Sequence, residues 1–131
     1  MSKEILYKAK RVDNGEWVCG LPIYKNYIRV FTEHEYEDED GKKVKYSTTQ
    51  DCQVDPKTMC EFTGLIDKNK NKIFEHDILT VYNSNYSINF EDGGFTVGKS
   101  KIPLSLCFAT EENYVVIGNI FDNPELLEEE E

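Results

Sequence analysis

Turn signals recur roughly every 8 to 12 residues along the chain and separate short β-prone runs. Asp13, Asn14 and Gly15 predict a type I′ hairpin turn, and Asp40 with Gly41 predicts a second hairpin. The runs between such signals are rich in β-branched and aromatic residues, as in residues 27–32. The spacing therefore predicts a mainly β fold, α+β at most, of small SH3-like β-barrels whose sheets are joined by tight hairpins.

The end of the chain predicts a short C-terminal helix. The run Asp122-Asn123-Pro124 predicts an N-cap followed by proline at the first helical position. Residues 125–131 would then form a short helix carrying two adjacent leucines, Leu126 and Leu127. Such a helix is too short to be stable alone. We expect the leucines to dock on an apolar surface, most simply one that contributes to a homo-oligomer.

Three regions are expected along the chain. Residues 1–53 form an N-terminal β-hairpin region that carries an acidic loop at residues 33–40. Residues 54–122 form a β-barrel-like core, and residues 123–131 form the short acidic helical tail. Further strands are expected at residues 104–108 and 114–121. The core is expected to include three residues of that last strand, namely Val116, Ile117 and Ile120.

The net charge of −10 is unevenly distributed. Eleven of the 25 acidic residues lie in residues 33–40 and 125–131, so the rest of the chain has 14 acidic and 15 basic residues. Binding of nucleic acid by the whole surface is therefore disfavoured. Two local groups could still support it, as in small barrels that stack bases on aromatic rings. These possible interaction residues are Tyr24, Tyr27 and Arg29 in one group and Lys68, Lys70 and Lys72 in the other.

Nothing in the sequence predicts a catalytic, cofactor or metal site. The possible zinc ligands have no ligand spacing and include no Cys-x-x-Cys pair; they are Cys19, Cys52, Cys60, Cys107, His34 and His76. Glu75, His76 and Asp77 could in principle perform acid–base hydrolysis, but many surface turns have this composition. We therefore expect a protein that is not an enzyme, with no catalytic residue, no cofactor and no metal.

Mean hydropathy is −0.59, and no apolar run approaches the roughly 18 residues that a membrane span requires. The N-terminus has no apolar stretch of signal-peptide length. We expect a cytoplasmic protein without a membrane partner, whose cysteines stay reduced.

Three strings carry a resemblance to a known family. They are Asn14-Gly15-x-Trp17-x-x-Gly20, "FTGL-D-N" over residues 62–69 and "IGNI--NPEL" over residues 117–126. In this order they resemble the YopX family of phage and prophage proteins. The family usually has glycine near Lys70 and at His76, which implies a left-handed backbone at His76. Residues 24–53 carry little of the resemblance.

The resemblance implies a small protein encoded by temperate phages or their remnants, acting in the bacterial host cell, with no reaction to transfer. The leading hypothesis is a non-enzymatic accessory protein that self-associates or binds a host or phage protein. One alternative is a small-barrel nucleic-acid-binding protein. Another is an acidic inhibitor that mimics a nucleic-acid backbone.

Overall fold

The computed structural model describes residues 5–81, 83–91, 93–98, 102–103 and 114–127. The chain divides into two compact units, a first unit of Leu6–Met59 and a second unit of Cys60–Glu131 with Met1–Ile5. The described residues form antiparallel strands and short 3-10 turns, so the prediction of a mainly β fold is confirmed.

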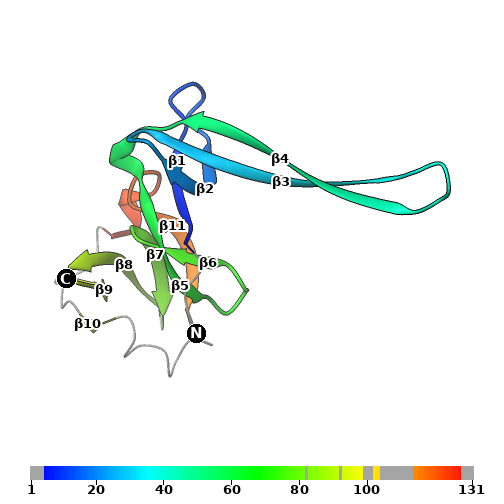
Figure 1. The fold of residues 1–131 in the computed structure, drawn as a ribbon. Helices are drawn as coiled ribbons and strands as arrows, with labels where there is room; N and C mark the ends of the chain where they lie inside the picture. The colour runs from blue at the N-terminus through cyan, green and yellow to red at the C-terminus, as the bar shows by residue number, and fades with distance from the viewer. Residues whose placement is uncertain (1–4, 82, 92, 99–101, 104–113, 128–131) are drawn as a thin grey trace. The chain divides into compact units, whose positions relative to one another are not determined.

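The first unit is a four-stranded antiparallel sheet in the order β4-β3-β2-β1 (Figure 1). The strands are β1 (Tyr7–Lys10), β2 (Trp17–Ile23), β3 (Tyr27–Glu37) and β4 (Lys43–Gln53), followed by the 3-10 turn η1 (Pro56–Thr58). Its core is small because the buried apolar side chains lie at one end of the sheet. Ala9, Ile28 and Val54 are fully buried there, packed against Val18 and Met59.

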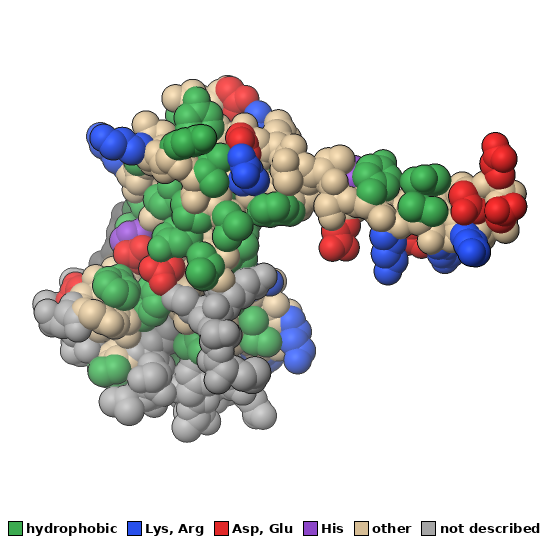
Figure 2. All heavy atoms as spheres, viewed as in Figure 1, with side chains coloured by type: hydrophobic (Ala, Val, Ile, Leu, Met, Phe, Trp, Pro, Cys, Tyr) green, Lys and Arg blue, Asp and Glu red, His purple; other side chains and the backbone are tan. Residues whose placement is uncertain are grey.

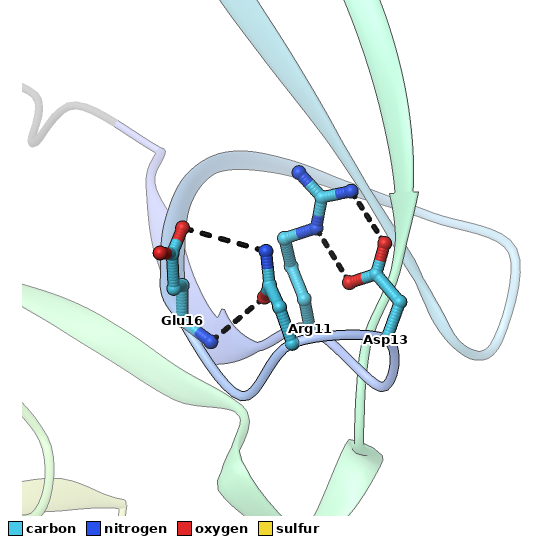
Figure 3. A network of polar contacts seen from close by, with 4 residues as sticks. Arg11, Asp13 and Glu16 are labelled. Atoms are coloured by element: carbon cyan, nitrogen blue, oxygen red, sulfur yellow. Dashed lines mark hydrogen bonds and ion pairs between the residues drawn. The ribbon is translucent and has the colours of Figure 1, made fainter.

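The turn between β1 and β2 is held by its own side chains (Figure 3). Arg11 donates to both carboxylate oxygens of Asp13 at 2.9 and 2.7 Å, and Asn14 Oδ1 accepts the Glu16 N–H at 2.9 Å. Within this turn only Gly15 has a positive φ, at 73°. A type I′ turn needs positive φ at both central residues, so that prediction is wrong.

The second unit contains the hairpin of β5 (Cys60–Ile66) and β6 (Lys72–Phe74) and a sheet in the order β10-β9-β8-β7-β11. That sheet comprises β7 (Asp77–Val81), β8 (Ser84–Glu91), β9 (Gly94–Val97), β10 (Ile102–Pro103) and β11 (Val115–Asn119). The core of this unit is formed by Ile73, Leu79, Ile88 and Tyr114.

The predicted barrel is wrong for the described residues. Closure would require the two end strands of a sheet to pair with each other. β10 pairs with β9 and β11 pairs with β7, so these two strands end an open sheet. The SH3-like arrangement is not confirmed. The expected strand at residues 104–108 lies outside the described residues.

The C-terminal helix is not confirmed either. Residues 124–127 form a single 3-10 turn, η3 (Pro124–Leu127), closed by the Leu126 N–H donating to the Asn123 carbonyl at 3.1 Å. An i to i+3 bond of this kind defines a tighter turn than the α-helix that residues 122–124 predicted. Residues 128–131 lie outside the described part of the chain.

Ile117 was predicted to lie in the core and does not. The register of β11 on β7 shifts between Val116, which pairs with Leu79, and Gly118, which pairs with Ile78. Ile117 is the extra residue of this β-bulge, and 37% of it is exposed. Val116 and Ile120 are half-buried.

The acidic stretch is not the predicted loop of residues 33–40. Residues 33–37 belong to β3, and the turn is confined to residues 38–42. Asp38 closes this turn, because its carboxylate accepts the N–H groups of Asp40 and Lys42 at 2.9 and 2.8 Å. Gly41 provides the positive φ, at 81°.

Candidate functional site

The longest feature of the first unit is the hairpin of β3 and β4. The two strands pair without a break from Tyr27 opposite Gln53 to Glu37 opposite Lys43. β2 pairs with β3 only from Tyr27 to Arg29. Beyond that point the hairpin is a two-stranded ribbon, here called the arm (residues 30–50), that extends past β1 and β2 (Figure 1).

The arm has two different faces, because successive side chains of a strand point to opposite sides and directly paired residues share a side. The aromatic face consists of Val30, Thr32, His34, Tyr36, Val44, Tyr46, Thr48 and Gln50. The charged face consists of Phe31, Glu33, Glu35, Glu37, Lys43, Lys45, Ser47 and Thr49. Figure 2 shows hydrophobic side chains along the arm, with acidic and basic ones along one margin and at the tip.

The rings of the aromatic face contact one another. His34 stacks on Tyr46 with ring centroids 4.8 Å apart, and Tyr36 lies edge-on to Tyr46 at 5.9 Å. His34 Nε2 is also 2.8 Å from the Thr48 hydroxyl. These contacts leave Tyr36 53% and Tyr46 48% exposed. The arm thus presents a row of preorganised rings with unburied apolar area, a composition typical of protein interfaces.

Sequence reasoning did not single out His34, Tyr36 and Tyr46 as interaction residues. For His34 and Tyr36 a signal exists in residues 33–37, where glutamates alternate with the two ring side chains. A period of two is the pattern of a strand with two unlike faces. The concentration of charge instead suggested a loop.

Arg29, one of the predicted interaction residues, is paired within the chain. Its guanidinium donates to both carboxylate oxygens of Asp51, directly across the hairpin, at 2.8 and 3.0 Å. This hydrogen bond lowers the pKa of Asp51 and raises the pKa of Arg29. A guanidinium already bound to a carboxylate has less to gain from a phosphate.

Tyr24 and Tyr27 lie close together, with ring centroids 6.5 Å apart in an edge-on arrangement. Tyr24 is in the turn between β2 and β3, with a φ of 53° and 88% of its surface exposed. Tyr27 is 37% exposed. With Arg29 they belong to the first unit.

The three predicted lysines belong to the second unit, at the turn of the β5–β6 hairpin. Lys68, Lys70 and Lys72 are all exposed. The Lys72 ammonium lies 5.8 Å from the centre of the Phe62 ring, so its charge sits over an aromatic face.

Leu126 and Leu127 are half-buried in η3. The Asn85 side chain of β8 donates to the Leu126 carbonyl at 3.0 Å. The described part of the tail therefore packs against its own unit.

Glu75 and His76 form the two-residue connection from β6 to β7, and Asp77 is the first residue of β7. His76 has a φ of 70°, which confirms the predicted left-handed backbone, and Lys70 has the same φ. The Asp77 carboxylate accepts the Phe74 N–H at 2.8 Å. His76 Nε2 is 3.5 Å from Glu75, and the His76 ring lies edge-on to Phe121 with centroids 5.5 Å apart. The Asp77 hydrogen bond and the left-handed His76 backbone both serve to close the tight turn between β6 and β7.

Within the described residues, no group of three or more His, Cys, Asp or Glu side chains is arranged to hold a metal ion. No helix in that part of the chain is long and apolar enough to cross a membrane.

Comparison with models of protein families shows to which family the chain belongs. The model of the family described as "YopX protein" matches residues 6–128. The chain belongs to the YopX family. Its fold is similar to the crystal structure of protein EF1440 from Enterococcus faecalis, with a TM-score of 0.64 and 25% identity over 97% of this chain and all of that one. No curated protein matches the chain.

Residues of the sequence motifs that resemble the YopX family hold turns of the backbone in place. Asp67 is buried, and its carboxylate accepts the N–H groups of Asn69, Asn71 and Val116 at 2.8–2.9 Å. It thereby caps the β5–β6 turn and ties that turn to β11. Desolvation would raise the pKa of Asp67, but these hydrogen bonds outweigh it and the pKa is lowered.

The YopX string of residues 117–126 also builds a turn. Asn119 Oδ1 accepts the N–H groups of Phe121 and Asp122, each at 3.0 Å. Asn123 Oδ1 accepts the Asn119 N–H at 3.2 Å. A Cβ on Gly118 would lie 2.4 Å from that same Asn123 oxygen, so the glycine makes room for the turn.

The N-terminal YopX string is structural in the same way. A Cβ on Gly20 would lie 2.1 Å from the Arg29 carbonyl oxygen, so glycine permits the close approach of β3. The half-buried Trp17 ring has the ammonium groups of Lys8 and Lys10 at 4.9 and 5.6 Å from its centre. The residues that identify the family therefore specify turns and strand contacts, while the arm provides the unburied surface.

Proposed function

We propose that this YopX protein is a phage or prophage accessory protein that is not an enzyme and acts in the bacterial cytoplasm as a self-associating interaction module. The observation that carries the proposal is the aromatic face of the arm, whose rings remain about half exposed at Tyr36 and Tyr46. An isolated two-stranded hairpin is marginal in water, so a partner that covers this face would stabilise it.

Charge favours the aromatic face over the opposite one as the contact surface. Its side chains include no Lys, Arg, Asp or Glu, whereas the other face carries three glutamates and two lysines. Burying unpaired charge is costly, whereas aromatic residues are enriched and charged residues depleted at the centre of interfaces.

The test is sedimentation of the full chain at tens of micromolar beside two double variants. Tyr36→Ser with Tyr46→Ser removes rings from the aromatic face, and we expect self-association to weaken by at least about tenfold. Glu33→Ser with Lys45→Ser changes the same two strands on the charged face and is expected to leave assembly intact. A full chain that sediments as a monomer contradicts self-association, and equal weakening by both double variants contradicts the assignment to the aromatic face.

A further inference from the structure

Resting on that proposed self-association, we propose that the open edge of β4 pairs antiparallel with β4 of a second copy, centred on Ser47. β4 ends the strand order of its sheet, so in the described chain β3 is its one neighbouring strand. The backbone of an edge strand is a template on which another strand can add.

Three hydrogen bonds define which residues of β4 face the open edge, because consecutive residues in an antiparallel strand alternate between the two sides. Val54 N–H donates to the Asn26 carbonyl, and the Lys42 carbonyl accepts the Asp38 N–H, so even positions bond toward β3. The Gln53 carbonyl accepts the Val12 N–H at 3.1 Å on the other side. The free edge therefore consists of Lys43, Lys45, Ser47, Thr49 and Asp51.

Ser47 is the middle residue of this free edge. When two copies pair around it, Lys43 lies opposite Asp51 of the second copy and Lys45 lies opposite its Thr49. All five outward-facing residues then find a counterpart, and opposite charges meet. A centre two residues nearer the tip would put Lys45 against Lys45. A centre two residues nearer the base would need the Gln53 carbonyl, which Val12 occupies.

The part of β3 beyond its pairing with β2 is less suited to pair with a second copy. It carries Glu33, Glu35 and Glu37, so pairing it with itself in a symmetric antiparallel register around Glu35 would place glutamates directly opposite one another. The β4 edge has instead an uncharged stretch, residues 46–50, between Lys45 and Asp51. Pairing there would place Tyr46 opposite Thr48 of the second copy, so the aromatic faces of the two copies meet at the contact and form one surface across four strands.

The test is oxidative crosslinking of Ser47→Cys, read on non-reducing gels with oxidised glutathione as the oxidant. Directly opposed residues of a hydrogen-bonded antiparallel pair have Cα atoms about 5.5 Å apart, which suits a disulfide. The matched control is Glu33→Cys, because Glu33 lies directly opposite Ser47 on β3 and on the same face. The parent chain, with its own cysteines, gives the background. We expect covalent dimer from Ser47→Cys and background levels from Glu33→Cys and the parent chain.

A second variant tests the backbone bonds themselves. The Ser47 N–H faces the open edge, so Ser47→Pro leaves the β3–β4 ladder intact, as proline at an edge can. We expect it to keep the circular dichroism of the parent and to weaken dimerisation by about tenfold or more, whereas Ser47→Ala should not.

The outcomes separate this pairing from the proposed function. A dimer in which Ser47→Cys crosslinks no better than Glu33→Cys overturns the pairing while self-association stands. Assemblies that grow without limit as concentration rises also overturn it, since they indicate β3-to-β4 contacts between copies. A chain that is monomeric at tens of micromolar overturns both.

Discussion

The arm and the β5–β6 hairpin are both antiparallel hairpins, but they are stabilised differently. No residue from 31 to 51 is buried, although β3 and β4 are each 11 residues long. In the β5–β6 hairpin, β6 has only three residues, yet Phe62, Ile73 and Phe74 are buried and the Thr63 hydroxyl donates to the Ile73 carbonyl at 2.7 Å. The β5–β6 hairpin is stabilised by buried side chains of its own unit, while the arm leaves its side chains exposed to a partner.

The largest expected effect is in the core of the second unit. Leu79 is 1% exposed, and Leu79→Ala should lower the free energy of unfolding by about 2–5 kcal/mol because it leaves a cavity. Ile117 is the matched control, since it is an apolar residue on the neighbouring strand displaced outward by the bulge. Ile117→Ala should cost less than about 1 kcal/mol in the same denaturant titration. Equal losses would mean that the bulge does not form.

The next effect concerns Asp67, which links the β5–β6 turn to β11. Asp67→Asn keeps the shape but removes the charge from three N–H contacts, and should cost about 1–3 kcal/mol. Because the pKa of Asp67 is lowered in the folded state, its contribution is present above the unfolded pKa of about 3.9 and is lost as pH falls through the folded value. The stability difference between parent and variant should therefore shrink in acid, and a constant difference from pH 7 to pH 2 would contradict the role of the charge.

A similar or smaller loss of folding stability is expected from a substitution at Gly118, near the end of β11. Gly118→Ala forces a methyl group against Asn123 and should cost about 1–3 kcal/mol. Gly94→Ala is the control, because a Cβ at Gly94 meets nothing within 4 Å. If thermal unfolding shifted as much for Gly94→Ala, the close approach at Gly118 would not explain the loss.

The smallest effect on stability is expected from shortening the arm. Replacing residues 31–49 by Asn-Gly joins Val30 to Gln50, a directly opposed and hydrogen-bonded pair, through a two-residue turn. Since no buried side chain is removed, the unfolding free energy should change by less than about 1 kcal/mol. Self-association should be lost in the same variant, measured by sedimentation. A large loss of stability would show that the arm supports the first unit.

The sequence predicted the backbone well where side chains act locally. The hairpin at Asp40 and Gly41 follows from adjacent residues, whereas the left-handed backbone at His76 was implied by the glycine of the YopX resemblance. The arm was missed because its acids suggested a loop, and only pairing with residues 43–53 makes residues 33–37 a strand. The bulge at Ile117 depends on how β11 meets β7, distant in the chain, so the alternation of apolar residues alone could not reveal it.

The chain has a single tryptophan, Trp17, and it lies in the first unit beside two lysines. Indole emission depends on nearby charge and solvent, so its intensity and wavelength report the state of that unit alone. The second unit contributes tyrosine and phenylalanine signals without an indole. Comparing tryptophan emission with far-ultraviolet circular dichroism in one denaturant titration would therefore show whether the two units unfold together or in separate steps.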